Sequence, residues 1–271
     1  MPAEEAVAVA STTAEQVHIA KRASSMKKTI IIALVATVVL GGIAAAIVVA
    51  VVPTNGAASP PAPSTAPAQS GTGTSSTLKI LCLHGGGQTA QSFEFSMQAL
   101  RSALGQRVSF VFASSPYPGN LWIRGPPGGK GAPTTGADWA ADSFTTLDNL
   151  VSAQGPFDGI LGFSQGGAMV VTYLSSASAR ASFRFAVILC GYVPSTHQGL
   201  EARINAAAPI SIPTAVYYGT GDPIISNAMT LAAADKFSSS TIVSDGGGHG
   251  PPSSGAALTA IVSFVNGFLS S

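Results

Sequence analysis

The chain has 271 residues, of which 46% are hydrophobic and 9% charged, and its formal net charge is +1. The hydrophobic content excludes a disordered chain, and the lack of a basic surplus excludes a protein that binds nucleic acid by neutralising its phosphates. The composition therefore predicts a folded protein whose partners are not nucleic acids.

The first element along the chain is segment 29–52, TIIIALVATVVLGGIAAAIVVAVV, which carries no charge and is long enough to cross a bilayer as a helix. A cleavable signal peptide is the alternative, but its apolar core is usually about 7–15 residues long and lies nearer the start. No Lys or Arg follows the segment until Lys79, whereas four basic residues precede it: Lys21, Arg22, Lys27 and Lys28. Because basic flanks stay cytosolic, we expect a retained signal-anchor that holds the chain in a lipid bilayer, with a cytosolic tail (1–28) and a lumenal or extracellular C-terminal part.

Residues 53–76 are dominated by Pro, Ala, Ser, Thr and Gly. This composition is typical of an extended, flexible stalk that has no core of its own. The remaining residues, 77–271, are numerous enough for one domain with a single well-buried core.

Short apolar runs recur through residues 77–271. Six of them are continuously apolar, as strands buried on both faces of a parallel sheet are: 78–84, 108–113, 158–163, 185–190, 214–219 and 240–244. Stretches of helical character separate or follow them: 91–104, 137–153, 166–179 and 255–269. The alternation predicts a doubly wound, mostly parallel α/β sheet with active residues on loops at the carboxyl ends of its strands.

Both cysteines, Cys82 and Cys190, fall within predicted strands. If the strand at 158–163 lies between theirs in the sheet, it separates the two backbones by about 9–10 Å. That separation is too large for a disulfide. We therefore expect two buried free thiols.

The sequence Gly162-Phe163-Ser164-Gln165-Gly166 follows a predicted strand and precedes a predicted helix. It matches the G-x-S-x-G nucleophile elbow, in which a sharp turn strains the serine backbone and glycines two residues away leave room for strand and helix. The serine hydroxyl then lies near a helix N-terminus, where developing negative charge is favoured. A turn that merely contains a serine is the alternative, but the strand–turn–helix context favours Ser164 as the nucleophile.

A serine nucleophile needs a base, and the chain has four histidines. His18 lies in the cytosolic tail, His84 ends the first strand and is expected to hold its loop, and His197 is expected on a surface loop. His249 follows the last strand in DGGGHGPP, where hydrolase chain order (Ser, acid, His) places the base. The order of residues therefore predicts His249 as the base.

The acid that orients the imidazole is expected on the glycine-rich loop after strand 214–219, where Asp222 lies. A simple turn Asp is the alternative reading, because Asp-Pro is a common turn pair. Asp245 is the second candidate, but it lies four residues before His249 and would have to fold back within its own loop. We expect Asp222 to be the acid.

The loop HGGGQ after the first strand predicts an oxyanion hole, because glycines let backbone N–H groups face a reacting carbonyl oxygen. The expected donors are the N–H groups of Gln165 and Gly86, with Gly87 as the second choice in the loop. The Gly/Pro-rich segment 114–136 is expected on the rim of the site or as a mobile surface loop. No dinucleotide fingerprint, phosphate loop or metal-ligand spacing is found, so neither cofactor nor metal is expected.

Five motifs in order resemble the FSH family of small serine hydrolases, within the α/β-hydrolase superfamily: ILCLHGGGQTAQSF, GPFDGILGFSQGGAM, VILCGYVP, VYYGTGDPII and GGGHGPP. The resemblance covers essentially all of 77–271. It implies a lidless or nearly lidless hydrolase with a Ser164, Asp222, His249 triad that cleaves carboxylic esters or thioesters of acyl chains without metal or cofactor.

Esterase activity is the leading functional interpretation of these motifs. An acyl thioesterase would use the same residues. A catalytically inactive binding domain is the interpretation from another class, since a fold alone does not establish function. The presence of the nucleophile, base, acid and oxyanion loop together favours a working enzyme.

Overall fold

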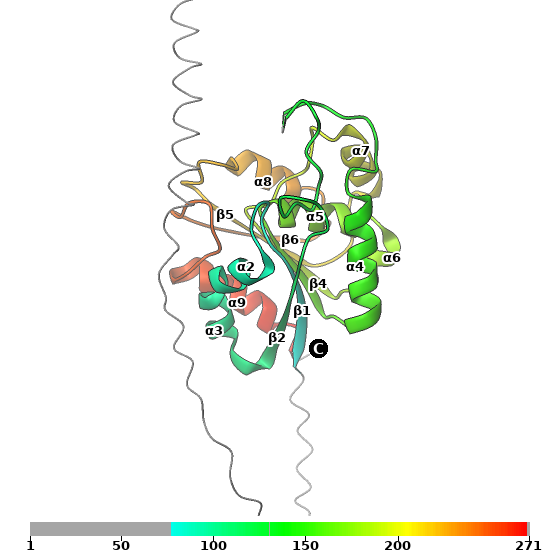
Figure 1. Ribbon diagram of the computed structural model, residues 1–271. Coiled ribbons are helices and arrows are strands. Elements are labelled where there is room, and N and C mark those ends of the chain that lie inside the picture. The colour runs from blue at the N-terminus through cyan, green and yellow to red at the C-terminus, as the bar shows by residue number, and fades with distance from the viewer. Residues whose placement is uncertain (1–76, 130, 270–271) are drawn as a thin grey trace, which may run out of the picture. The chain divides into compact units, whose positions relative to one another are not determined.

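A six-stranded parallel sheet forms the centre of residues 77–129 and 131–269, which are the residues that this computed structural model describes (Figure 1). Its spatial order is β2-β1-β3-β4-β5-β6. The strands are β1 (Leu78–Leu83), β2 (Val108–Ala113), β3 (Gly159–Phe163), β4 (Phe185–Leu189), β5 (Thr214–Gly219) and β6 (Ser240–Asp245). All six predicted strands are confirmed to within one residue at either end.

The sheet has an apolar core on each face, because successive side chains of a strand point to opposite sides. In β1, Leu81 and Leu83 pack in one core, while Ile80 and Cys82 pack in the other. Every residue of the central strands β3 and β4 is buried, whereas the edge strands β2 and β6 have exposed positions. The continuous apolar runs of the sequence therefore correspond to strands covered by helices on both faces, as predicted.

A different set of helices covers each face of the sheet. In Figure 1, α2, α3 and α9 lie on one side of the sheet and α4 and α6 on the other. Their bounds are α2 (Ala90–Ser96), α3 (Gln98–Leu104), α4 (Ala141–Gln154), α5 (Gln165–Leu174), α6 (Ala177–Arg180), α7 (Gln198–Ala207), α8 (Asn227–Ala234) and α9 (Gly255–Asn266), with a 3-10 turn η1 (Gly105–Arg107). This arrangement confirms the doubly wound α/β fold.

The helices differ from the predictions in several places. The helix predicted over 137–153 begins at Ala141, and the helix predicted over 255–269 ends at Asn266. The stretch predicted as one helix over 91–104 is two helices, because Met97 has a φ of −86° and a ψ of 3° and ends one helix as it begins the next. The helix predicted over 166–179 ends at Leu174, and α6 follows separately. Helices α7 and α8 were not predicted. In α7 only Leu200 and Ile204 are buried, so its apolar periodicity is weak.

The two cysteines are buried and free. Strand β3 separates their strands, since Leu161 pairs with Cys82 of β1 and with Val187 of β4. Burial raises the pKa of the Cys82 thiol well above its ordinary value. The prediction of two buried free thiols is confirmed.

Within the described ranges, no helix has both the length and the apolar character needed to cross a bilayer. The predicted membrane anchor (29–52), the tail before it (1–28) and the stalk after it (53–76) lie outside those ranges. Membrane attachment therefore stays a prediction.

Candidate active site

Ser164 lies on the turn between β3 and α5, with a φ of 52° and a ψ of −118°. A positive φ is unfavourable for a residue with a Cβ atom, and such strain is concentrated at functional sites. The N–H of Ser164 donates to the carbonyl of Leu189 at 2.9 Å, which fixes the turn to the end of β4. The serine is therefore held in a conformation that the surrounding sheet imposes.

Two glycines make this turn sterically possible. A Cβ atom on Gly162 would lie 2.3 Å from the carbonyl oxygen of Gly166, and a Cβ on Gly166 would lie 2.2 Å from that of Leu83. Both distances are shorter than any tolerated contact. The close approach of β3, α5 and β1 at the elbow thus requires glycine on either side of the serine, for the reason expected from the motif.

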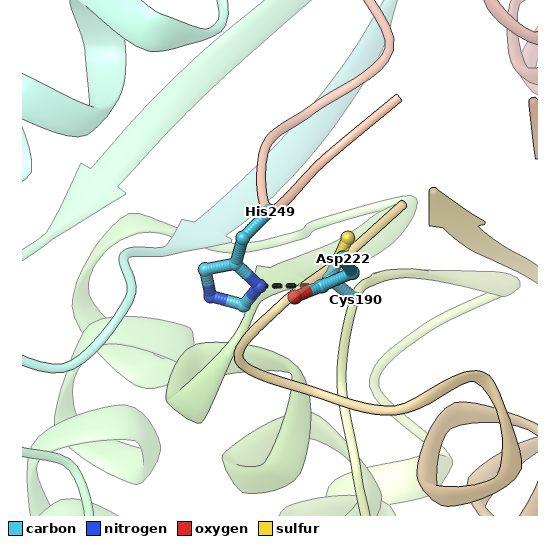
Figure 2. A group of neighbouring side chains, drawn as sticks. All are labelled: Cys190, Asp222 and His249. Atoms are coloured by element: carbon cyan, nitrogen blue, oxygen red, sulfur yellow. Dashed lines mark hydrogen bonds and ion pairs between the residues drawn. The ribbon is translucent and has the colours of Figure 1, made fainter. Parts of the chain in front are cut away.

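The structure places Ser164, His249 and Asp222 in one hydrogen-bonded line. His249 Nε2 lies 3.0 Å from Ser164 Oγ, and His249 Nδ1 lies 2.6 Å from Asp222 Oδ2; the latter pair is shown in Figure 2. The three side chains come from the loops after β3, β6 and β5, which all end at the same edge of the parallel sheet. The Asp222 side chain is 1% exposed and that of His249 is 14% exposed.

Asp222 is held ionised by its hydrogen bonds. Its Oδ1 accepts from the N–H groups of Ile224 at 2.8 Å and Ile225 at 2.9 Å. Burial by itself raises the pKa of this carboxyl, but the hydrogen bonds from His249 and the two N–H groups outweigh burial and hold the pKa below its ordinary value. An ionised Asp222 accepts the Nδ1 proton of His249, which leaves Nε2 free to accept from Ser164.

Asp245, the second candidate for the acid, has different partners. Its Oδ1 accepts from the hydroxyl of Tyr217 at 2.8 Å and from the N–H of Gly247 at 2.7 Å. These bonds close the loop two residues before His249. Asp245 therefore supports the histidine loop, while Asp222 is the carboxylate at hydrogen-bond distance from the imidazole.

The predicted oxyanion donors lie side by side. A Cβ atom on Gly86 would be 3.2 Å from Oε1 of Gln165, the first residue of α5. The N–H of Gly87 already donates to the carbonyl of Asn120 at 3.0 Å. An N–H that is engaged elsewhere cannot stabilise an oxyanion, so the geometry favours Gly86 over Gly87 as the loop donor.

The Gln165 side chain has a structural role that the sequence motifs did not indicate. Its Oε1 accepts from the N–H of Trp122 at 2.9 Å, and its Nε2 donates to the carbonyl of Ile123 at 3.1 Å. The indole of Trp122 in turn donates to the carbonyl of His84 at 2.9 Å. The middle of segment 114–136 is therefore fastened to the elbow and to the end of β1.

The two remaining described histidines serve the scaffold. His84 Nδ1 donates to the carbonyl of Gly85 at 2.8 Å, and its Nε2 accepts from the N–H of Ser115 at 3.3 Å. Burial lowers the pKa of His84, which keeps the ring neutral in that tautomer. The expectation that His84 holds its loop is confirmed.

The expectation that His197 lies on a surface loop is wrong. His197 is 7% exposed and immediately precedes α7. Its Nδ1 lies 3.0 Å from Thr134 Oγ1, and its ring centroid lies 5.4 Å from that of Trp139. The segment before α4 covers this histidine, a long-range contact that local sequence could not indicate.

Cys190 is the neighbour of the triad that sequence reasoning missed. Its sulfur, an oxygen of Asp222 and a ring nitrogen of His249 lie within 4.8 Å of one another (Figure 2). Metal ligation would require a thiolate, but burial, the dominant cause, raises the pKa of Cys190 to about 11. Nδ1 and Oδ2 already share a hydrogen bond, so the chemistry of this set fits a supported triad better than a metal centre.

Comparison with known proteins identifies the family. The family model described as serine hydrolase (FSH1) matches residues 74–122 and 118–261. Esterase GA18864 of Drosophila pseudoobscura pseudoobscura is 29% identical over 69% of this chain and 70% of its own length. Esterase OVCA2 of Mus musculus is 27% identical over 71% of this chain and 97% of its own length.

A solved structure supports the fold. Acyl-protein thioesterase 2 of Zea mays superposes with a TM-score of 0.55 at 18% identity, over 73% of this chain and 96% of its own. At that identity the likeness shows the α/β-hydrolase fold alone. Together with the family match, which confirms the resemblance seen in the motifs, these findings show that the chain belongs to the FSH1 family of serine hydrolases and is an esterase.

Proposed function

We propose that this esterase hydrolyses carboxylic esters of acyl chains through Ser164, His249 and Asp222. The observation that carries the proposal is the hydrogen-bonded line from Ser164 Oγ to His249 at 3.0 Å and from His249 to Asp222 at 2.6 Å. The positive φ of Ser164 supports it, because the strain holds the hydroxyl at the N-terminus of α5.

The proposed reaction has two halves that use the same groups. Ser164 Oγ attacks the ester carbonyl while its proton passes to His249 Nε2, and the N–H groups of Gly86 and Gln165 stabilise the oxyanion. His249 then protonates the leaving alcohol, which departs and leaves an acyl-serine. His249 next takes a proton from water, whose oxygen attacks the acyl-serine, and returns the proton to Ser164 as the acid leaves.

The first test compares the full chain with its Ser164→Ala variant on p-nitrophenyl esters of graded acyl length. Because the variant has no nucleophile, kcat is expected to fall by about 10⁴- to 10⁶-fold. Acyl thioesters of the same lengths, assayed in parallel, distinguish an esterase from an acyl thioesterase that uses the same residues. Equal rates for parent and variant on every substrate would contradict the proposed nucleophile.

The location of the enzyme is a second part of the proposal. Segment 29–52 is proposed to anchor the chain in a bilayer, with the catalytic part lumenal or extracellular, because four basic residues precede the segment and none follows it until Lys79. Alkaline extraction of membranes from expressing cells should leave the full chain in the pellet, and deletion of 29–52 should release it. Release of the full chain by alkali would contradict the anchor.

A further inference from the structure

Cys190 lies beside the catalytic pair but has no part in the proposed reaction. It follows β4 directly, is fully buried, and places its sulfur next to the Asp222 carboxylate (Figure 2). The neighbouring strands β3 and β5 carry the loops of Ser164 and Asp222. Cys190 thus ends the strand that lies between the strand of the proposed nucleophile and the strand of the proposed acid.

The backbone at Cys190 is held in an unfavourable conformation. Its φ is 48°, and among the described non-glycine residues only Asn120 and Ser164 also have a positive φ. Its N–H donates to the carbonyl of Tyr217 in β5 at 2.7 Å. Glycine would adopt this conformation without steric cost. The presence of a cysteine here instead suggests that its side chain has a role.

The thiol of Cys190 links two loops. Sγ donates to the carbonyl oxygen of Gly250 at 3.7 Å, one residue after His249. The sulfur also lies within 4.8 Å of a carboxylate oxygen of Asp222. One buried side chain therefore bonds to the loop of His249 and lies beside the carboxylate of Asp222.

Three glycines of the histidine loop provide little packing of their own, and the backbone bond from the N–H of Gly221 to the carbonyl of Gly247 at 2.9 Å holds the loop only before His249. Cβ atoms added to Gly246, Gly248 or Gly250 would have no neighbour within 4 Å. Asp245 fastens the loop before His249 through the N–H of Gly247, and Cys190 fastens it after His249 through Gly250. The imidazole is thus held between two anchors.

We propose that Cys190 is a positioning residue whose thiol keeps His249 in line with Asp222 by joining the Gly250 carbonyl to the acid's loop. The proposal rests on the proposed catalytic roles of His249 and Asp222. Because the buried thiol stays protonated, it supports the geometry without adding a charge beside the carboxylate.

The kinetic test uses three variants of the full chain: Cys190→Ala, Cys190→Ser and Cys82→Ala. In Cys190→Ala, kcat is expected to fall about 10- to 100-fold with KM within about twofold of the parent, because a small misplacement of the base costs reactivity rather than substrate binding. Cys190→Ser keeps a donor for the Gly250 carbonyl and should retain at least about one third of parental kcat. Cys82→Ala, which removes a buried thiol from β1 away from the site, should keep parental kcat.

A second measurement does not depend on ester turnover. The proton in the hydrogen bond between His249 and Asp222 is followed as a low-field resonance by NMR of the full chain without substrate. The resonance should be the same in the parent, Cys190→Ser and Cys82→Ala, and be shifted or lost in Cys190→Ala. If the parent hydrolysed no ester, the proposed function would fail while this spectrum still tested the positioning role.

Two results would overturn the proposal. One is a folded Cys190→Ala protein with parental kcat and an unchanged resonance. The other is an equal loss in Cys190→Ala and Cys190→Ser, which would mean that sulfur volume rather than the donated hydrogen bond matters. Should Cys190→Ala fail to fold, Cys190→Gly replaces it, since glycine suits the positive φ, and parental kcat in that variant counts equally against the role.

Discussion

The loop that carries Ser164 and the loop that carries His249 are both rich in glycine, but they are held in different ways. At the elbow, the glycines are enclosed by backbone atoms, and a Cβ on Gly162 or Gly166 would collide with a carbonyl oxygen. In the histidine loop, Gly246, Gly248 and Gly250 face open space. Ser164 is therefore positioned mainly by steric enclosure. The loop of His249 is positioned by hydrogen bonds, which involve the side chains of Asp245 and Cys190 and the N–H of Gly221.

Asp222, the proposed acid, gives the largest expected effect on activity. Asp222→Asn keeps the shape of the side chain but favours the wrong tautomer of His249, so kcat should fall by about 10⁴-fold. The variant should stay folded at the assay pH and lose only the stability that the ionised carboxylate supplies, because the elbow does not depend on this residue. Ester hydrolysis and thermal unfolding of the two proteins check this prediction, and a loss below about tenfold would contradict the role of Asp222.

Enclosure of the elbow is tested by Gly166→Ala. The added methyl would lie 2.2 Å from the carbonyl oxygen of Leu83, so backbone must shift, and the free energy of unfolding should fall by about 2–4 kcal/mol. Urea unfolding followed by circular dichroism measures the loss. A variant as stable as the parent would show that strand and helix can separate at the elbow without cost.

The anchor before His249 is tested by Asp245→Ala. This change leaves the hydroxyl of Tyr217 and the N–H of Gly247 without their acceptor, which should cost about 1–3 kcal/mol of stability. Because Asp245 helps to hold the loop of His249 in place, kcat should fall about tenfold while KM changes little. Tyr217→Phe removes one of the two bonds and serves as the milder comparison. Unchanged kcat in Asp245→Ala would mean that the loop is held in some other way.

The pH dependence of stability should reveal the buried acid. Since hydrogen bonds keep the pKa of Asp222 below its ordinary value, its ionised form stabilises the fold above the unfolded pKa of about 3.9, and this contribution is lost as pH falls through the lower folded pKa. The difference in free energy of unfolding between the parent and Asp222→Asn should therefore shrink as urea titrations go from pH 6 to pH 3. A constant difference would contradict the lowered pKa.

The smallest effect is expected for Gly248→Ala, the matched control for the elbow glycine. A Cβ at this position meets nothing within 4 Å, so stability should change by less than about 0.5 kcal/mol and kcat by less than about twofold. The same assays as for Gly166→Ala measure it. A large loss would remove the contrast between the two loops.

The sequence predicted the features that depend on local residues and missed those that depend on distant contacts. Strands, elbow and chain order depend on local apolar runs and on glycine spacing, so β1 to β6 and the positions of Ser164, Asp222 and His249 could be read directly. The burial of His197 depends on contacts with Thr134 and Trp139, about sixty residues earlier in the chain. No local pattern reports these contacts.

The side-chain supports were missed for a related reason. Gln165 lies within a recognised motif, but the partners of its amide, Trp122 and Ile123, are more than forty residues away. Cys190 was predicted as the last residue of a strand and lies one residue after β4, and its proximity to Asp222 requires the strand order and the loop after β5. A polar or thiol residue at the end of a strand next to the nucleophile strand is the signal that could have raised the question.

The two buried thiols have a practical consequence for work on this enzyme. The chain contains no other cysteine, and in both the thiol is shielded and held protonated by burial, so alkylating reagents should react with neither under native conditions. A spectroscopic probe can therefore be attached at one introduced cysteine without first removing the native pair. Ile224→Cys is a suitable site, because Ile224 is 64% exposed and belongs to the loop that carries the acid.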